Sequence, residues 1–188
     1  MLTAKRVYAM LDNESLWNAA MRCHRALADA NVPHAVVGGV AVCLHGYQRN
    51  TVDVDLLIRS VDSDAVRVTL EAEDFVWNAG EKEFRTEDGI AIQFLLAGDR
   101  AGTGSEVLLP DPSDVKVTTE IEDLPVITLA KLIESKIACG MGNLRRTHKD
   151  FADVVELILC NRLNSSFTRY LHKSLRATYR ELVRMSRG

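Results

Sequence analysis

An apolar segment that carries two acids sets the strongest constraint on how this chain can fold. Residues 52–58 read Val-Asp-Val-Asp-Leu-Leu-Ile, a run typical of a buried β-strand. Because side chains alternate along a strand, Asp53 and Asp55 leave it on the same face. Two like charges on an apolar strand are costly unless something compensates them. Mg²⁺ favours carboxylate oxygens together with substrate phosphates, so the spacing predicts that Asp53 and Asp55 hold a divalent cation.

A glycine pair stands upstream of these acids. Gly38-Gly39 follows an apolar stretch at 34–37 and precedes residues 40–45, so we expect it between a strand and a short helix. Glycine lets the backbone come close to phosphate oxygens, and N–H groups at the start of a helix favour an anion. Either feature alone is also common in purely structural turns. Together, the glycines and the acids predict a phosphate-binding turn beside a metal-binding pair.

The remaining pattern predicts an α/β unit followed by helices. Helical spacing of apolar residues predicts a helix over 14–30, and Asp62 or Ser63 can cap a second that runs to 73. Asp88-Gly89 predicts a hairpin joining 82–86 to 90–96. We expect a mobile glycine-rich loop over 97–105 and further strands between 107 and 127. Helices are expected from Thr128 to Cys139, from Thr147, and from Ser165 or Ser166 onward. We therefore place an α/β domain at 1–125 and a helical region at 126–188.

The composition of the chain indicates where the protein is located more than what it does. The chain has 188 residues, 47% of them hydrophobic and 26% charged, and a net charge of −3, all ordinary for a soluble globular protein. Its four cysteines are scattered, which favours free thiols over disulfides or a zinc site. No stretch approaches the length of a membrane span or a secretory signal. We expect a cytoplasmic protein with no membrane contact.

The pattern G-G-x₁₃-D-x-D after an apolar strand resembles the nucleotidyltransferase superfamily, whose fold is that of DNA polymerase β. A fuller string resembles the small bacterial members related to AbiEii-type abortive-infection toxins. Its positions are occupied by Gly38, Gly39, Ala41, His45, Gly46, Arg49, Thr51, Asp53 and Asp55. The segment from Leu129 to Lys136, followed by Lys149-Asp150, is similar to that group's helical part. The resemblance implies an α/β (α+β) fold, with a mixed sheet flanked by helices and a C-terminal helical bundle.

The resemblance also implies an activity. Such an enzyme moves a nucleoside monophosphate from an NTP to an acceptor, using Mg²⁺ or Mn²⁺ held by Asp53 and Asp55. RNA, protein and small molecules stay open as acceptors, and the toxin-like branch implies a cognate antitoxin as a partner. The implied nucleotide-binding residues are Gly38, Gly39, Arg49, Thr51 and Lys136. Arg49 would steady phosphate charge or pin the strand through Thr51. A surface arginine and a solvated helix lysine are the alternatives for Arg49 and Lys136.

One position departs from the family pattern. The family places a third catalytic carboxylate on a neighbouring strand, and Gln93 is the only polar residue in the matching stretch. Glutamine can coordinate weakly through its carbonyl oxygen, but it supplies no negative charge and no base. Three interpretations stay open. The chain is a slow enzyme, or Glu87, Asp88 or Asp99 compensates, or it is a catalytically silent NTP-binding or regulatory protein.

Basic residues recur near the C-terminus at steps of three and four. They are Arg169, Lys173, Arg176, Arg180, Arg184 and Arg187. This spacing predicts one ridge on the last helix. The ridge is either a solvated polar face or a surface for RNA. An RNA-interacting protein that retains the fold only as a scaffold is therefore a third hypothesis.

Overall fold

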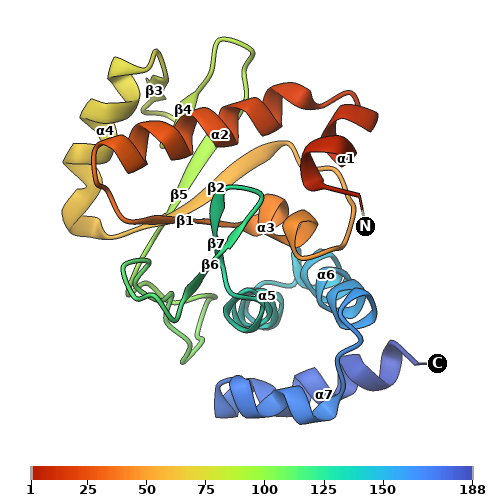
Figure 1. The fold of residues 1–188 in the computed structure, drawn as a ribbon. Coiled ribbons are helices and arrows are strands. Elements are labelled where there is room, and N and C mark those ends of the chain that lie inside the picture. Colours follow the sequence, from red (N-terminus) through yellow and green to blue (C-terminus); the bar gives the residue numbers. More distant parts are fainter. Residues whose placement is uncertain (1, 188) are drawn as a thin grey trace.

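A computed structural model describes residues 2–187, which form a mixed seven-stranded sheet covered by helices (Figure 1). The strand order is β3-β4-β5-β2-β1-β7-β6. The strands are β1 (His34–Val37), β2 (Asp53–Ile58), β3 (Val76–Asn78), β4 (Glu83–Arg85), β5 (Ala91–Leu96), β6 (Thr118–Ile121) and β7 (Leu124–Ile127). The helices are α1 (Ala4–Met10), α2 (Glu14–Asp29), α3 (Gly38–Leu44), α4 (Ser63–Ala72), α5 (Leu129–Gly142), α6 (Thr147–Cys160) and α7 (Arg176–Met185). Short 3₁₀ helices are η1 (Ser60–Asp62), η2 (Ser165–Tyr170) and η3 (Lys173–Leu175).

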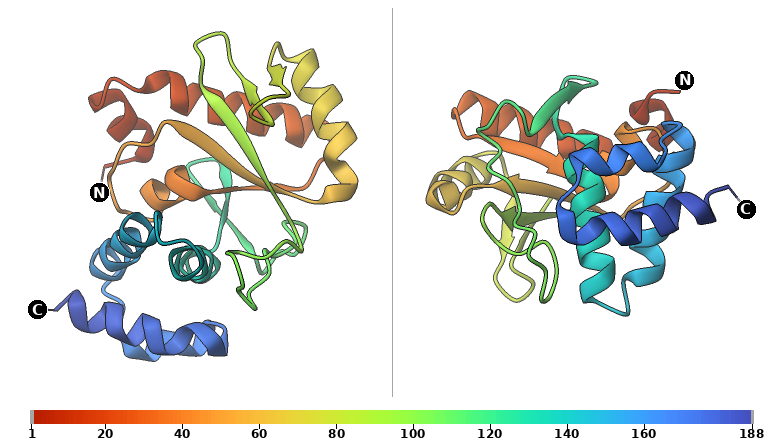
Figure 2. Two further views of the ribbon diagram at one scale, coloured as in Figure 1. Left: turned by 180° about the vertical axis from the view of Figure 1, so that it is seen from behind. Right: turned by 90° about the horizontal axis from the view of Figure 1, so that it is seen from below.

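The helices lie in two groups. α1, α2 and α4 lie on one side of the sheet and α5, α6 and α7 on the other, with α7 farthest from the strands (Figures 1 and 2). The helical spacing read from the sequence explains the position of α2, because Leu16, Ala20 and Leu27 all point from it into the core with no exposed surface. The expected mixed sheet with flanking helices and a helical C-terminal part is confirmed.

The two central strands bring distant residues together. β1 pairs antiparallel with β2, and Val37 is the partner of Asp55. Gly38 follows Val37, so this register places the glycine turn directly beside the acid. β2 also pairs in parallel with β5, where Asp55 is the partner of Gln93. All four residues of β1 are buried, as expected for an apolar strand between two others.

The predicted final helix is wrong in its first half. The chain forms η2 and η3 before α7 begins at Arg176. Leu171 is extended (φ −104°, ψ 149°), and the His172 N–H donates to the Glu134 carboxylate. The His172 ring then accepts from the Ser174 N–H and starts a new turn. The basic residues therefore do not share one helical ridge.

Other element boundaries also differ from expectation. The hairpin at Asp88-Gly89 is confirmed, but α1 and β3 had not been predicted. α5 runs through its glycines to Gly142 instead of ending at Cys139. A side chain at Gly140 would meet the Phe151 ring within 2.5 Å, so the glycine allows α5 and α6 to pack closely. β7 ends at Ile127, so the domain boundary expected at 125 falls inside a strand.

The sequence predicted free cysteines and no membrane-spanning helix. Among residues 2–187, all four cysteines are free. Over the same range, no helix combines the length and the apolar character needed to cross a membrane.

Candidate functional site

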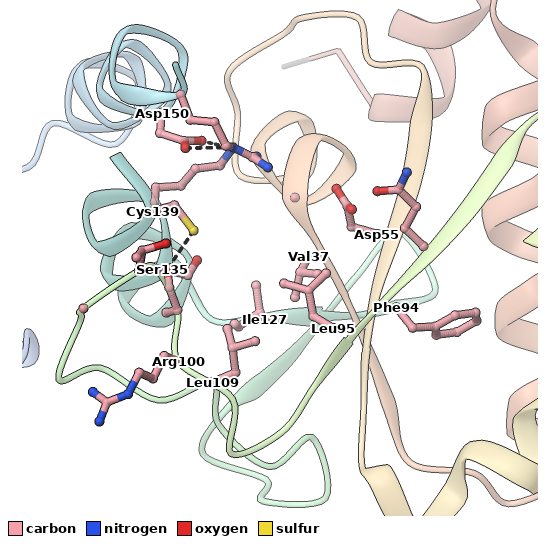
Figure 3. Close-up of a pocket in the computed structure, with 18 residues that line it drawn as sticks. Val37, Asp55, Phe94, Leu95, Arg100, Leu109, Ile127, Ser135, Cys139 and Asp150 are labelled. Carbon is pink, nitrogen blue, oxygen red and sulfur yellow. Dashed lines mark hydrogen bonds and ion pairs between the residues drawn. The ribbon is translucent and has the colours of Figure 1, made fainter. Parts of the chain in front are cut away.

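A cavity of about 730 Å³ lies between the sheet and the helical part of the chain (Figure 3). Asp55 reaches it from β2, and Asp150 reaches it from α6 on the opposite side. Four of the residues singled out from the sequence line this cavity: Gly38, Asp55, Gln93 and Lys136. Four others do not line it: Gly39, Arg49, Thr51 and Asp53. The site residues predicted from the sequence therefore include four in the wall of the cavity and four outside it.

Gly38 is needed because of its contact with Asp55. Its φ is +60°, a conformation that residues with a side chain rarely adopt. A Cβ on Gly38 would lie only 1.8 Å from Oδ2 of Asp55. The missing side chain of Gly38 thus leaves the space that the Asp55 carboxylate occupies. The carboxylate therefore packs directly against the turn between β1 and α3.

Gly39 and Thr51 support the acids from behind. A Cβ on Gly39 would lie 2.5 Å from Oγ1 of Thr51, so the missing side chain lets Thr51 pack there. The Thr51 hydroxyl donates to Oδ1 of Asp53 at 2.9 Å. The Gly39 backbone N–H lowers the pKa of Asp55. These two residues therefore hold the carboxylates in place and do not face the cavity.

The electrostatics of the acid pair favour a cation. Burial raises the pKa of Asp55 above its ordinary value, and the nearby charge of Asp53 raises it further. Lys136, Arg146 and the Gly39 N–H oppose this rise without cancelling it. The protein alone therefore leaves the negative charge of the pair under-compensated. A divalent cation would supply the missing positive charge.

The oxygen donors fit a cation that binds together with a nucleotide. Two carboxylates share one face of β2, and the Gln93 carboxamide lies on the next strand. Within residues 2–187, no group of three or more His, Cys, Asp and Glu side chains is placed to hold a metal. Mg²⁺ typically takes one or two carboxylates and completes its coordination with substrate phosphates and water. The donor set matches that kind of site.

Gln93 has a partner that the sequence analysis missed. Its Nε2 donates to Oε2 of Glu83 on β4 at 2.9 Å. Glu83 is only 3% exposed, and its other oxygen, Oε1, lies 2.5 Å from the Arg85 guanidinium. Glu87, Asp88 and Asp99, named as compensating acids, do not line the cavity. Counting back from the three-residue turn Glu87-Asp88-Gly89 pairs residue 83 with residue 93, so the hairpin signal could have identified Glu83.

Lys136 lies in a buried ionic network between α5 and α6. Its Nζ is 3.0 Å from Oδ1 of Asp150 and 2.7 Å from Oδ2 of Asp153, and all three side chains are buried. Arg146 adds a longer contact to Asp150, 3.3 Å, from the rim of the cavity. Asp150 and Asp153 therefore brace the helices. Arg146 was missed, although it stands one helical turn before Asp150.

Arg49 belongs to the same network. Its Nε lies 2.8 Å from Oδ1 of Asp153, and its NH1 donates to the backbone oxygen of Asn50. Arg49 thereby ties the segment before β2 to α6. On the helical side, Lys136 and Arg146 balance the charges of Asp150 and Asp153. Arg49 adds a further positive charge from the segment before β2.

The glycine-rich loop at residues 97–105 closes one side of the cavity. Ala101 accepts a hydrogen bond from the Cys139 thiol at 2.7 Å. A Cβ on Gly102 would clash with the carbonyl oxygen of Ala138, so the loop lies directly against α5. Arg100 lines the cavity from this loop and is itself exposed. The expected mobility of the loop stays a prediction.

Comparison with known proteins identifies the fold. No protein-family model and no curated protein matches the sequence. The crystal structure of ANT(2'')-Ia in complex with adenylyl-2''-tobramycin superposes with a TM-score of 0.56 at 16% identity, covering 87% of this chain and 96% of that one. A proposed nucleotidyltransferase from H. pylori gives 0.55 at 16% identity, covering 94% and 92%. An antigenic nucleotidyltransferase-like protein from Paracoccidioides brasiliensis gives 0.53 at 19%, covering 90% and 88%.

These similarities show that the chain has the nucleotidyltransferase-type fold, as the glycine and aspartate pattern predicted. Nothing in these neighbours bears on the AbiEii-like branch.

Proposed function

We propose that this protein is a Mg²⁺-dependent nucleotidyltransferase that moves a nucleoside monophosphate from an NTP to an acceptor, with pyrophosphate leaving. One observation carries the proposal. Asp55 lines a cavity beside Gly38, next to Asp53 on the same face of β2 and opposite the cationic network at Lys136. The fold shared with ANT(2'')-Ia, a protein crystallised with an adenylylated compound, adds support.

The proposed roles fall to residues on two sides of the cavity, the sheet and the helical part. Asp53 and Asp55 would hold the cation, and Mn²⁺ could replace Mg²⁺ there. When bound, the cation neutralises phosphate charge during in-line displacement. Gly38 keeps the space beside Asp55 open. Lys136 and Arg146 offer positive charge to the departing phosphates from the helical side.

Arg49 and Thr51, which belong to the AbiEii-like string, support the acids and the adjoining segment. This is compatible with a toxin-like enzyme in the cytoplasm, with a cognate antitoxin as its partner. RNA, protein and small molecules remain acceptors to be tested, and the interrupted basic ridge at the C-terminus gives RNA no preference.

A second candidate function is a catalytically silent NTP-binding or regulatory protein. Gln93 occupies the position beside Asp55, and the described residues hold no three-acid metal cluster. Loss of a general base commonly costs a factor of about 10²–10⁴ in rate. Such a protein would bind Mg-NTP in the same cavity without turnover.

The experiment that separates these candidates is label transfer. The protein is incubated with each α-labelled NTP and Mg²⁺ or Mn²⁺, together with cellular RNA, protein or small-molecule extract. We expect transfer that is lost in Asp53→Ala and retained in Asp64→Ala, a matched change at an exposed aspartate on α4. Binding of Mg-NTP without transfer supports the silent candidate. Absence of both rejects the two candidates together.

A further inference from the structure

Three polar side chains form a row across three neighbouring strands. Asp55 on β2 is the partner of Gln93 on β5. The β4–β5 hairpin pairs Phe84 with Ile92, and the next step outward sets Glu83 beside Gln93. Side chains of directly paired residues point to the same face of a sheet. The row therefore runs from the cavity at Asp55, through Gln93, to the buried Glu83.

The chemistry of the two outer groups fixes how the Gln93 amide is turned. An ionised carboxylate only accepts hydrogen bonds, so the NH₂ end of Gln93 must face Glu83. The carbonyl oxygen of Gln93 is then the end that remains for the cavity. Glu83 is itself held by Arg85 and is almost fully buried, so it has little freedom to release the amide.

We infer that Glu83 is a positioning residue that orients the Gln93 carboxamide with its oxygen toward Asp55 and the cavity. Gln93 then serves the nucleotide-bound cation as a neutral oxygen ligand. This inference rests on the proposed function, because it assigns a role at the same site. Glu83 does not line the cavity and acts only through Gln93.

The same contact explains why an acid does not stand at position 93. A carboxylate there would lie about as close to Glu83 as the amide nitrogen does now, 2.9 Å. Two buried carboxylates at that separation repel each other strongly. Besides that of Asp55, the negative charge of the row therefore sits on Glu83, one strand farther from the cavity than Gln93. An acid at position 93 requires a neutral partner at 83.

The first test exchanges the two residues. In Gln93→Glu alone, the hydrogen bond is replaced by repulsion, and we expect the midpoint of thermal unfolding to fall by roughly 3–12 °C. In the double variant Glu83→Gln/Gln93→Glu, the amide at 83 can donate to the acid at 93. Most of that loss should be recovered, so the two changes should be strongly non-additive. Additive losses would overturn the inference.

The second test measures binding of each Mg-NTP at equilibrium. In Glu83→Gln, the partner can both donate and accept, so the Gln93 amide is free to turn either way. We expect the affinity for Mg-NTP to fall by roughly 10–100-fold, the usual effect of losing a group that orients a metal ligand. The double exchange should restore binding, because an oxygen again faces the cavity. Glu87→Gln, at an exposed site in the same hairpin, is the matched control.

The outcomes distinguish the inference from the proposed function. If wild type and Glu83→Gln bind Mg-NTP equally well, the inference is overturned and the proposed function stands. If wild type binds no Mg-NTP, the proposed function fails, and the ligand role given to Gln93 fails with it. Weaker binding in Glu83→Gln, restored by the exchange, supports both.

Discussion

The contact between Gly38 and Asp55 can be tested with a single methyl group. Gly38→Ala places a Cβ 1.8 Å from Oδ2 of Asp55, far inside any tolerated contact, so the carboxylate must move. The same substitution at Gly89 makes a matched control. Gly89 also has a positive φ, +81°, but a Cβ there would meet nothing within 4 Å.

The expected magnitudes follow from these two environments. An L-residue in the left-handed region costs about 1–2 kcal/mol, which both variants should lose. For a chain of this size, that corresponds to a fall of roughly 2–8 °C in the midpoint of thermal unfolding. Gly38→Ala should lose about 1–3 kcal/mol more from overpacking. Displacement of Asp55 should also weaken Mg-NTP binding by at least roughly 10–100-fold.

Thermal unfolding and equilibrium binding of Mg-NTP measure the two effects separately. We expect Gly89→Ala to lose stability and keep full Mg-NTP affinity, whereas Gly38→Ala loses both. If Gly38→Ala binds Mg-NTP as wild type does, Asp55 is not needed at its observed position, and the reasoning about the site is refuted.

Two further predictions concern stability. Lys136→Met removes the buried cation that Asp150 and Asp153 share and leaves each carboxylate with one arginine. It should lower the free energy of unfolding by about 3–5 kcal/mol in urea denaturation. Arg67→Met, at the exposed Arg67–Glu71 pair, should cost less than about 1 kcal/mol, and similar losses in both variants would contradict the buried network. Burial lowers the pKa of His34, whereas the unfolded chain protonates this ring below about pH 6.5. Stability should therefore fall as the pH drops below that value, and His34→Gln should reduce this slope in a pH series of thermal unfolding; an unchanged slope would exclude His34 as the cause.

The parts of the site that depend on local pattern were predictable. The alternation along β2 gives the shared face of Asp53 and Asp55, and the apolar run before Gly38 gives β1. Lys136 could be named only through the resemblance, because nothing in its own spacing reveals Asp150 and Asp153 as partners. Arg49 was expected at the phosphates or beneath the strand, and its pairing with Asp153 depends on how α6 packs against the segment before β2.

The C-terminal helix shows why periodicity alone is insufficient. The spacing of Phe167, Leu171, Leu175 and Tyr179 suits a continuous helix, yet the chain is extended at Leu171. The interruption is stabilised by the Glu134 carboxylate of α5 and by the Arg176 side chain, which donates to the Leu171 carbonyl oxygen. Glu134 and His172 are far apart in the sequence, so no local pattern predicts the contact between them.

The register of β2 has a consequence for how relatives of this chain can be found. β2 is paired on both sides, so a one-residue slip in its register would turn both acids to the opposite face of the sheet. Residues 46–50 belong to no helix or strand, although Arg49 among them is paired with Asp153 of α6. The gap between Gly39 and Asp53 can therefore lengthen there without turning the acids, so a motif search that fixes it at thirteen residues is stricter than the register of β2 requires. A search that fixes Thr-x-Asp-x-Asp and lets the gap vary follows the physical constraint.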